Sequence, residues 1–449
     1  MSRLFADHAL LPEGFATRVL LSWDDHGQLT GVQAGVGCPA DVPRAAGLVV
    51  PGLPNLHSHA FQRAFAGLTE YRASAHDSFW SWRELMYRFA GAVSPDELEA
   101  IATQLYVEML RAGYTSVCEF QYVHHDPAGR PYANPAEMSL RLVAAARRAG
   151  IGLTMLPVLY QASGFGAKPP RDDQKRFLND VDALLGIVEV LRGQGVRTGV
   201  APHSLRAVPP AALAELMAGL DSIDAKAPVH IHIAEQMQEV RDSIAHSGAR
   251  PLQWLLDHAP VDERWCLVHA THLDDAERDG AAHRGAVIGL CPTTEANLGD
   301  GLFDLPAWSD ARKGAWGIGS DSHASVDAAE ELRLLEYGQR LARQQRNVSV
   351  ADDLWRAAVV GGAQAAGRPV AGLTVDQQAD FLVLADPMLD GLAPAQQLAS
   401  HLFASHRREA VREVWVAGQR VVDQGHHAVQ EAAQSGFLAA RARLLEALR

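Results

Sequence analysis

Apolar and polar positions alternate along the middle of the chain in a regular order of strands and helices. Short apolar runs predict eight buried strands, at residues 48–50, 115–120, 152–160, 198–204, 229–235, 265–272, 286–292 and 316–323. Apolar residues at helical spacing separate most of these strands and predict helices at 94–112, 136–149, 174–193, 209–219 and 237–257, and from 274 and 327 onward. Ser94 and Glu97 have the spacing of a capping box, which marks the start of the first of these helices.

Strands that alternate with helices predict a parallel sheet. Eight such units over roughly 320 residues fit a (β/α)₈ TIM barrel with insertions. A doubly wound open sheet is the alternative. No GxGxxG motif leads from a strand into a helix, which disfavours the open sheet.

The two ends of the chain have a different pattern. Short β runs with Gly and Asp turns occupy residues 19–25, 27–35 and 45–50 near the N-terminus, and 379–387 and 408–425 near the C-terminus. Because the N-terminal piece is too small to fold alone, we expect both ends to share one domain. The expected division is a small β-sandwich domain (1–49 plus 373–429), a barrel (50–372) and a C-terminal amphipathic helix (430–449).

The composition is that of an ordinary globular protein, with 48% hydrophobic and 21% charged residues among 449. The net charge of -13 is spread along the chain without a basic run, which argues against a nucleic-acid or anionic-membrane partner. No signal-peptide pattern opens the sequence, and no uncharged run approaches the roughly 20 residues of a membrane span. Widely spaced cysteines without a CxxC pair fit a reduced, cytoplasmic setting: Cys38, Cys118, Cys266 and Cys291. The oligomeric state stays open, with a homodimer expected.

Candidate chemistry begins with His57 and His59, which follow the first strand of the predicted barrel after a turn rich in proline and glycine. Side chains on a strand alternate between faces with period 2, so these two histidines point the same way and form a candidate pair of metal ligands. For an isolated HxH motif, a chance pair of ordinary histidines is the alternative.

Further polar residues stand at the ends of other predicted strands, on the side where barrel enzymes build their sites. They are His203 on strand four, His232 and Glu235 on strand five, His269 on strand six and Asp321 on strand eight. A core or loop histidine is the commoner explanation for each one alone, but their joint placement is hard to obtain by chance. Three imidazoles and a carboxylate suit zinc or ferrous iron and leave a position for water. A divalent ion lowers the pKa of that water from 15.7 toward about 7.

The HxH pair with His232, His269 and Asp321 resembles the amidohydrolase superfamily, over nearly the whole chain. Two-metal members generally carry a bridging carboxylated lysine on strand four or a bridging acid elsewhere, and strand four here has no lysine. With Glu235 three residues beyond His232, the pattern is similar to the one-metal deaminase branch. The resemblance implies one zinc per chain, with iron possible, a proton-shuttling glutamate, and a strand-six histidine beside the water.

Longer segments are similar to the N-formimidoyl-L-glutamate deiminases of that superfamily, namely LPNLHSHAFQRAFAGLTE, FWSWRELMYRF, CEFQYVHHD, APHSLRAV, HIHIAEQ and GSDSH. The resemblance implies the metal ligands His57, His59, His232 and Asp321, and the catalytic residues Glu235, His269 and Asp321. It also implies the substrate-binding residues Gln62, Arg83, Tyr122, His203 and Arg206. The implied reaction is hydrolytic deimination of N-formimidoyl-L-glutamate to N-formyl-L-glutamate and ammonia, a step of histidine degradation.

Two arginines and a tyrosine near a metal centre suit a small dicarboxylate, because guanidinium pairs bidentately with carboxylate. The alternative for Arg83 and Arg206 is a solvated loop charge. We interpret the aromatic loop 79–89 as a lid, with core packing as its alternative. The remaining histidines are expected to be structural or surface residues: His124, His125, His323, His406, His426 and His427.

Two rival functions stay open. The nearer is a deaminase of a cyclic amidine of purine or pterin type, whose site would favour stacking aromatics and amide donors over paired arginines. The more remote is a non-catalytic member of the superfamily. Such members usually lose ligands, whereas all four are present here.

Overall fold

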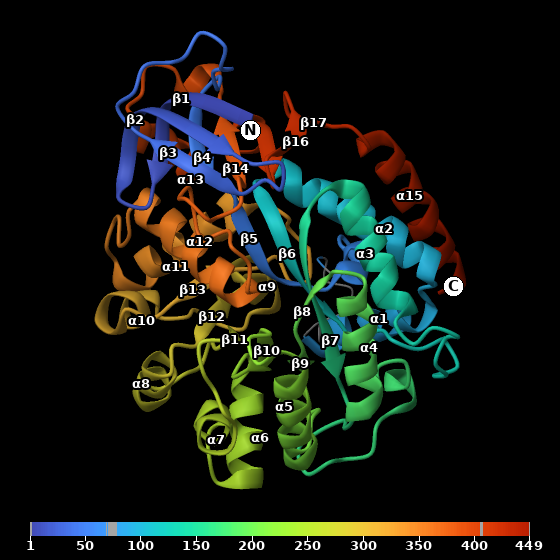
Figure 1. Cartoon of the computed structure of the whole chain (residues 1–449). Helices are drawn as coiled ribbons and strands as arrows, with labels where there is room; N and C mark the ends of the chain where they lie inside the picture. Colours follow the sequence, from blue (N-terminus) through green and yellow to red (C-terminus); the bar gives the residue numbers. More distant parts are fainter. Residues whose placement is uncertain (1, 69, 71–78, 405–406, 449) are drawn as a thin grey trace.

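The two ends of the chain come together in one sheet of eight strands (Figure 1). The computed structural model describes residues 2–68, 70, 79–404 and 407–448. From edge to edge the strand order is β17-β16-β15-β14-β4-β1-β2-β3. The strands are β1 (Ser2–Leu11), β2 (Gly14–Trp23), β3 (Leu29–Gln33), β4 (Leu48–Pro51), β14 (Phe381–Leu384), β15 (Val411–Val416), β16 (Gln419–Asp423) and β17 (His426–His427).

Strand β4 joins the N-terminal and C-terminal halves of this sheet. It pairs antiparallel with β14 and parallel with β1, and all four of its residues are buried. Aromatic residues from both halves meet beside it, where the ring centroid of Phe381 lies 5.9 Å from that of Trp23 and 5.3 Å from that of Trp415. The shared core explains why neither half needs to fold alone.

Parallel strands fill the described middle of the chain in two sheets. One contains β5 (Leu53–Ser58), β6 (Tyr114–Gln121), β7 (Gly152–Leu159), β8 (Arg197–Thr198) and β9 (Ala201–Pro202), and the other contains β10 (Val229–Ile233), β11 (Trp265–His269), β12 (Val287–Leu290) and β13 (Trp316–Ile318). Isolated parallel bridges link the two sheets at both ends, between Val200 and Val229 and between Ser58 and Asp321. Because all these strands run the same way, the residues that follow them gather at one end of the molecule.

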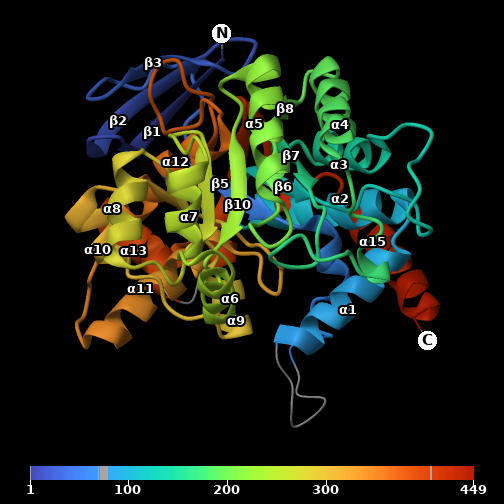
Figure 2. The same ribbon diagram turned by 90° about the horizontal axis from the view of Figure 1, so that it is seen from below.

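Helices lie around the parallel strands (Figures 1 and 2). They are α1 (Phe79–Ala92), α2 (Pro95–Arg111), α3 (Glu137–Ala149), α4 (Val181–Gly193), α5 (Pro210–Asp224), α6 (Met237–Ser247), α7 (Pro251–His258), α8 (Asp275–His283), α9 (Pro292–Leu298), α10 (Leu305–Arg312), α11 (Ala328–Arg343), α12 (Ala351–Ala366), α13 (Pro394–Phe403), α14 (Arg407–Ala410) and α15 (Gln430–Ala447). Short 3₁₀ turns occur at η1 (Ala60–Phe65), η2 (Asp172–Gln174) and η3 (Pro387–Leu389).

Several predicted elements have the expected form. Ser94 and Glu97 make the predicted capping box at the start of α2, each side chain accepting from the other residue's backbone N–H. Helix α15 occupies the predicted C-terminal helix and packs along α2 in both views (Figures 1 and 2). The cysteines are free thiols, with Cys38 exposed and the others buried: Cys118, Cys266 and Cys291.

Other predicted elements were wrong in place, extent or kind. The strand predicted at 48–50 as the first of the barrel is β4 of the terminal sheet, and the parallel strand that carries His57 is β5, where Pro54 and Asn55 interrupt the apolar residues. The helix predicted at 237–257 is two helices, because Gly248 ends α6 with a φ of 79° and Pro251 begins α7. The helix expected from 174 begins only after Asp180, whose side chain caps α4. Residues 79–89, expected as a loop, lie within helix α1.

Candidate active site

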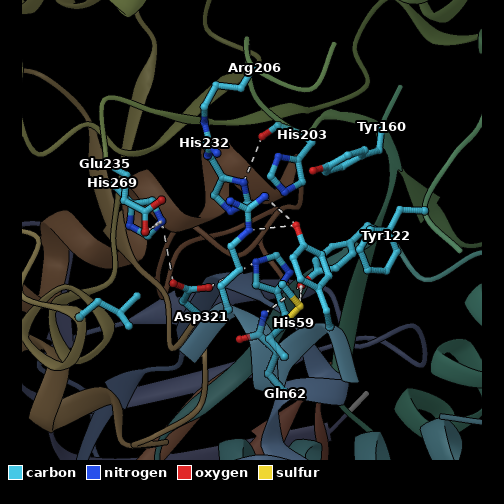
Figure 3. A pocket seen from close by; sticks show the side chains of 15 residues that line it. His59, Gln62, Tyr122, Tyr160, His203, Arg206, His232, Glu235, His269 and Asp321 are labelled. Atoms are coloured by element: carbon cyan, nitrogen blue, oxygen red, sulfur yellow. Dashed lines mark hydrogen bonds and ion pairs between the residues drawn. The ribbon is translucent and has the colours of Figure 1, made fainter. Parts of the chain in front are cut away.

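Four side chains from three strands converge on one point. His57 ends β5 with His59 close behind, His232 lies in β10, and Asp321 follows β13. The Nε2 atom of His57 is 3.1 Å from Nε2 of His59 and 3.0 Å from Nε2 of His232. Oδ1 of Asp321 lies 3.4 Å from Nε2 of His57 and 3.3 Å from Nε2 of His59. The structure therefore brings all four predicted ligands together, three of which Figure 3 labels.

The hydrogen bonds of these rings fit a cation site. Nδ1 of His59 faces the carbonyl oxygen of Phe120 at 3.0 Å, and Nδ1 of His232 faces that of His203 at 3.0 Å. A carbonyl only accepts, so each Nδ1 carries the hydrogen and each Nε2 presents a lone pair to the cluster. Ligands about 2.0–2.1 Å from a tetrahedral metal lie about 3.3 Å from one another, close to the 3.0–3.4 Å between His57 and each of the other three side chains. The ligand atoms of His57, His59 and Asp321 all lie within 4.8 Å of one another, and so do those of His57, His232 and His269. Nδ1 of His57 is buried without a hydrogen-bond partner in the described part of the chain.

Burial keeps the three imidazoles neutral. It lowers the pKa of His57 to about 3, and it lowers the pKa of His59 and of His232 as well. Asp321 stays ionised: burial raises its pKa, but its interactions with His57 and His59 outweigh burial and hold the pKa below its ordinary value. Neutral nitrogens with one anionic oxygen are donors that suit a divalent zinc or iron ion.

His269 lies among three carboxylates. Its Nδ1 is 3.3 Å from Oε1 of Glu295, and its Nε2 is 3.9 Å from both Oε1 of Glu235 and Oδ2 of Asp321. Burial lowers the pKa of His269, but the carboxylates, Glu235 foremost, outweigh it and raise the pKa to about 10. Burial raises the pKa of Glu235. The predicted catalytic residues thus form one contiguous group that can take up and pass on protons.

Cys291 lies near this group. Together with His269 and Asp321 it could offer ligand atoms to a cation. Burial raises the pKa of the Cys291 thiol well above its ordinary value, and a metal binds the thiolate. Burial therefore favours the protonated thiol at Cys291.

The backbone is strained where these strands end. Residues with a side chain rarely adopt positive φ, and each such position costs on the order of 1–3 kcal/mol. Five of them gather after β10, β11 and β13, with φ between 44° and 67°: Ala234, His269, Ala270, Asp321 and His323. Strain of this kind persists where the surrounding structure holds it, and it concentrates at functional sites.

A pocket of about 650 Å³, including its open mouth, lies over the cluster (Figure 3). All five residues predicted to bind substrate line it: Gln62, Arg83, Tyr122, His203 and Arg206. His59, His232, Glu235, His269 and Asp321 line the same pocket. Its size suits a small molecule, and the candidate ligands and proton-transfer groups are within reach of whatever binds there.

The two arginines are half-buried in the pocket wall. Arg83, on α1, donates to the hydroxyl of Tyr87 from Nε at 2.9 Å and from Nη2 at 2.7 Å. Nε of Arg206 is buried and has no hydrogen-bond partner within the described residues. Burial lowers the pKa of Arg206, but Glu239 and then Glu235 outweigh it, so that the pKa is raised. Neither arginine is a solvated loop charge.

Two other polar side chains of the pocket are held by hydrogen-bonding neighbours, and one of them has an atom without a hydrogen-bond partner. Gln62 donates from Nε2 to the hydroxyl of Tyr122 at 3.0 Å, while its Oε1 is buried without a partner in the described structure. The ring of His203 lies 3.1 Å from the hydroxyl of Ser204 through Nδ1. Burial, followed by the charge of Arg206, lowers the pKa of His203 well below its ordinary value.

Sequence reasoning missed two residues that support the ligands and the proton-transfer group. Glu295 contacts His269 from helix α9, which the sequence pattern did not predict, so no signal marked it. His323 was assigned only a structural or surface role. Its Nε2 accepts the backbone N–H of His59 at 3.2 Å and its Nδ1 lies 3.0 Å from the hydroxyl of Ser320. Its place at the end of the GSDSH motif was the available signal.

Glu119 is a third missed residue, buried behind the first ligand pair. It accepts from the hydroxyl of Ser58 and from the backbone N–H of Ala60, both at 2.7 Å. Burial raises the pKa of Glu119 to about 7. Because Ser58 and Ala60 flank His59, Glu119 anchors the segment that presents this ligand.

The remaining histidines that were predicted to be structural or surface residues lie away from the ligand cluster or outside the described residues. His124 and His427 are buried, each with Nε2 near a backbone carbonyl oxygen, at 2.9 Å and 2.8 Å. His125 is half-buried and His426 is exposed, while His406 lies outside the described residues. Within the described chain, no helix combines the length and apolar character needed to cross a bilayer.

Comparison with known proteins places this site in context. The model of the amidohydrolase family matches residues 48–421. A formimidoylglutamate deiminase of Pseudomonas aeruginosa is 50% identical, over 99% of this chain and 100% of its own length. A 5-methylthioadenosine/S-adenosylhomocysteine deaminase of Natronomonas pharaonis is 29% identical, over 84% of this chain and 81% of its own length.

Solved structures agree with the fold. An amidohydrolase from Brucella melitensis, 45% identical, superposes with a TM-score of 0.93 over 99% of this chain and 100% of its own. An adenosine deaminase from Xanthomonas campestris with bound zinc superposes with a TM-score of 0.81 at 23% identity, over 99% of this chain and 98% of its own. The second likeness concerns the fold alone.

Proposed function

The chain belongs to the amidohydrolase family, and from this we propose that it is a hydrolase that deiminates N-formimidoyl-L-glutamate. The products are N-formyl-L-glutamate and ammonia, in histidine degradation. The observation that carries the proposal is a single pocket shared by a convergent ligand cluster, a buried glutamate–histidine pair and two guanidinium groups. The relative named formimidoylglutamate deiminase, 50% identical over its full length, supports it.

One divalent ion per chain, zinc or alternatively iron, is held in this proposal by His57, His59, His232 and Asp321. The convergent donor atoms and the tautomers of the rings support this assignment. When bound, the ion supplies a Lewis acid that makes water reactive near neutral pH.

The substrate is a small dicarboxylate, bound through its two carboxylates by Arg83 and Arg206. Guanidinium groups pair bidentately with carboxylates, and such charge-assisted hydrogen bonds are among the strongest in proteins. Gln62, Tyr122 and His203 complete the contacts along the same wall. This binding directs the formimidoyl group toward the ligand cluster at the floor of the pocket.

Glu235, His269 and Asp321 move the protons. His269, whose pKa is raised to about 10, orients the attacking water by donating from Nε2, and Oδ2 of Asp321 accepts a hydrogen bond from that water. Glu235 carries a proton to the terminal nitrogen of the amidine, so that nitrogen leaves as ammonia. Burial raises the pKa of Glu235, which suits a carboxyl group that must both take and return a proton.

Finer structural assignments follow from the same family membership. The linked parallel sheets are proposed to form one (β/α)₈ barrel within residues 50–372, and both termini to form a β-sandwich domain (1–49 plus 373–429). Residues 430–449 close the structure as a separate helix. A lid at residues 79–89, a homodimer, a cytoplasmic location and the absence of nucleic-acid and membrane partners stay predictions.

The deciding experiment measures ammonia release by purified, metal-loaded protein from formimidoyl-glutamate and from a panel of aminopurines. We expect release from formimidoyl-glutamate, with N-formyl-glutamate as co-product, and little from the purines. Release from purines alone would favour the cyclic amidine deaminase, for which Tyr122, Tyr160 and Phe177 offer aromatic walls. Release from neither would favour a non-catalytic protein.

A further inference from the structure

A buried carboxylate that the proposed mechanism does not use lies directly behind the catalytic glutamate. Glu239 stands in the first turn of α6, with 4% of its surface exposed. Its Oε2 accepts a hydrogen bond from the backbone N–H of Glu235 at 3.3 Å. Its Oε1 is buried and has no hydrogen-bond partner among the described residues. A carboxyl group is costly to bury, so this one is expected to have a role.

Glu239 acts at the turn that leads into Glu235. Ala234, the residue before it, has a φ of 50°, which a residue with a side chain adopts only when its surroundings hold it there. Burial raises the pKa of Glu239, and the N–H groups of Ala234 and Glu235 are among the groups that oppose this rise. Both N–H groups therefore interact with the carboxylate. Glu239 fixes the turn from behind and so sets the direction in which the Glu235 side chain projects into the pocket.

Arg206 lines the pocket beside Glu235 but makes no hydrogen bond or close ion pair with Glu239 in the described part of the chain. The contact that links Glu239 to the pocket is therefore its hydrogen bond to the backbone of Glu235.

We propose that Glu239 is a positioning residue that aims Glu235 through the backbone. The inference rests on the proposed function, which assigns Glu235 to proton transfer.

Two conservative variants test this role. Glu239→Gln keeps an oxygen that can accept the N–H of Glu235, so kcat for formimidoyl-glutamate should stay within about threefold of the wild-type value. Glu239→Asp keeps the charge but withdraws the acceptor from the turn. We expect kcat to fall about tenfold or more, because Glu235 is no longer aimed, with a smaller change in KM.

Two controls show whether Glu239 acts through Glu235. In a Glu235→Gln background, Glu239→Asp should lower kcat no further, because the residue through which it acts is gone. Asp242→Asn removes an exposed carboxylate from the same helix and should change neither kcat nor KM. Metal content and the midpoint of thermal unfolding confirm that each variant is folded and loaded.

The possible results are distinct. An unchanged kcat in Glu239→Asp, or a fall that adds to that of Glu235→Gln, overturns the role toward Glu235. A similar fall of kcat in Glu239→Gln also overturns it, because that variant keeps the acceptor. If wild-type protein releases no ammonia from formimidoyl-glutamate, the proposed function fails, and the Glu235 role is then decided by kcat of Glu239→Asp on the amidine that the wild type does deiminate.

Discussion

Nδ1 of His232 donates a hydrogen bond to the backbone carbonyl oxygen of His203, at 3.0 Å. His203 therefore acts in two separate ways: its main chain orients a proposed metal ligand, and its ring lines the pocket. Groups that orient a ligating histidine fix its tautomer and affect metal affinity. Because the supporting group is the carbonyl, exchange of the His203 side chain leaves it in place.

His203→Ala should consequently keep the metal while losing activity. The ring contributes a substrate contact in the proposed function, and a lost hydrogen bond of about 1–1.5 kcal/mol lowers kcat/KM about tenfold. Elemental analysis and steady-state kinetics on the same preparation measure both quantities. His232→Ala is the matched control and should lose the metal. Metal loss in His203→Ala would show that the ring itself supports the site.

We expect one divalent ion per active chain. The ligand atoms of His57, His59, His232 and Asp321 surround one point, and the fourth predicted strand has no lysine to form a bridging carbamate. Chelation should abolish turnover and lower the midpoint of thermal unfolding, since bound metal stabilises the folded state, and one equivalent of zinc should restore both. Two tightly held ions per chain would contradict this prediction.

Glu235→Gln should retain the ion and lose turnover by a factor of about 10²–10⁴, the range typical of a general acid–base group. The amide is nearly isosteric with the carboxyl but cannot carry the proton. Glu235 lies 3.9 Å from His269 and makes no close contact with the ligand rings in the described structure. Loss of zinc in this variant would instead make Glu235 a ligand.

A pH prediction concerns Asp380, which is buried where the terminal sheet meets the parallel strands and accepts the N–H of Ala417 at 2.7 Å. Burial raises its pKa from 3.8 to about 6, although Ala417 and Arg368 oppose the rise. The folded state thus binds this proton more tightly than the unfolded state, so the stability it confers is present below about pH 4 and is lost as pH rises through about 6.

Asp380→Asn removes this dependence. Relative to wild type, the free energy of unfolding of the variant should increase by about 2–3 kcal/mol between about pH 4 and about pH 7, as measured by urea denaturation. Asp390→Asn, at an exposed carboxyl group, is the control and should show a difference that does not change with pH. If the difference in the free energy of unfolding between Asp380→Asn and wild type also stayed constant with pH, the raised pKa of Asp380 would be refuted.

Much of the fold could be predicted because buried parallel strands are continuous apolar runs, a local property of the sequence. Helix α9 could not, since PTTEANL is only seven residues long and has no amphipathic repeat. Strand β1 was not predicted, because Asp7 and His8 interrupt its run of apolar residues. The sequence pattern is weak in segments whose conformation depends on contacts with other parts of the chain.

Some residues of the candidate site could likewise be predicted from the sequence pattern, and others could not. Predicted strand ends located His232 and Asp321, because a parallel arrangement brings those ends together. His57 and His59 were found from the HxH motif, since the strand predicted before them is β4 of the terminal sheet. Arg83 and Arg206 were assigned from family resemblance, since nothing in their local pattern distinguishes them from solvated charges. The contacts of Glu295 with His269, and of Glu239 with the backbone of Glu235, join residues whose relation depends on backbone turns with positive φ. Apolar periodicity carries no information about those turns.

The last prediction concerns substrate choice. If Arg83 and Arg206 bind the two carboxylates, the loss of either guanidinium leaves a carboxylate unpaired in a partly desolvated pocket. A lost charge-assisted hydrogen bond costs roughly 1.5–3 kcal/mol, and about 1.4 kcal/mol corresponds to a tenfold change in rate. Arg83→Met and Arg206→Met should each lower kcat/KM for formimidoyl-glutamate at least about tenfold. Metal content should not change, because neither side chain is among the proposed metal ligands.

Neutral formamidines provide the decisive control for this prediction. They should be poor substrates of the wild type, because they cannot use the arginines, and for the same reason the two variants should lose little further activity against them. Arg83 also donates to the Tyr87 hydroxyl, which accepts from Gln174 as well. Tyr87→Phe removes this hydroxyl and leaves the guanidinium, so it tests whether a change in Arg83→Met comes from the lost charge. Equal loss of both activities in the arginine variants, or wild-type turnover of neutral amidines as fast as that of formimidoyl-glutamate, would contradict the dicarboxylate assignment. Either result would favour a cyclic amidine as the substrate.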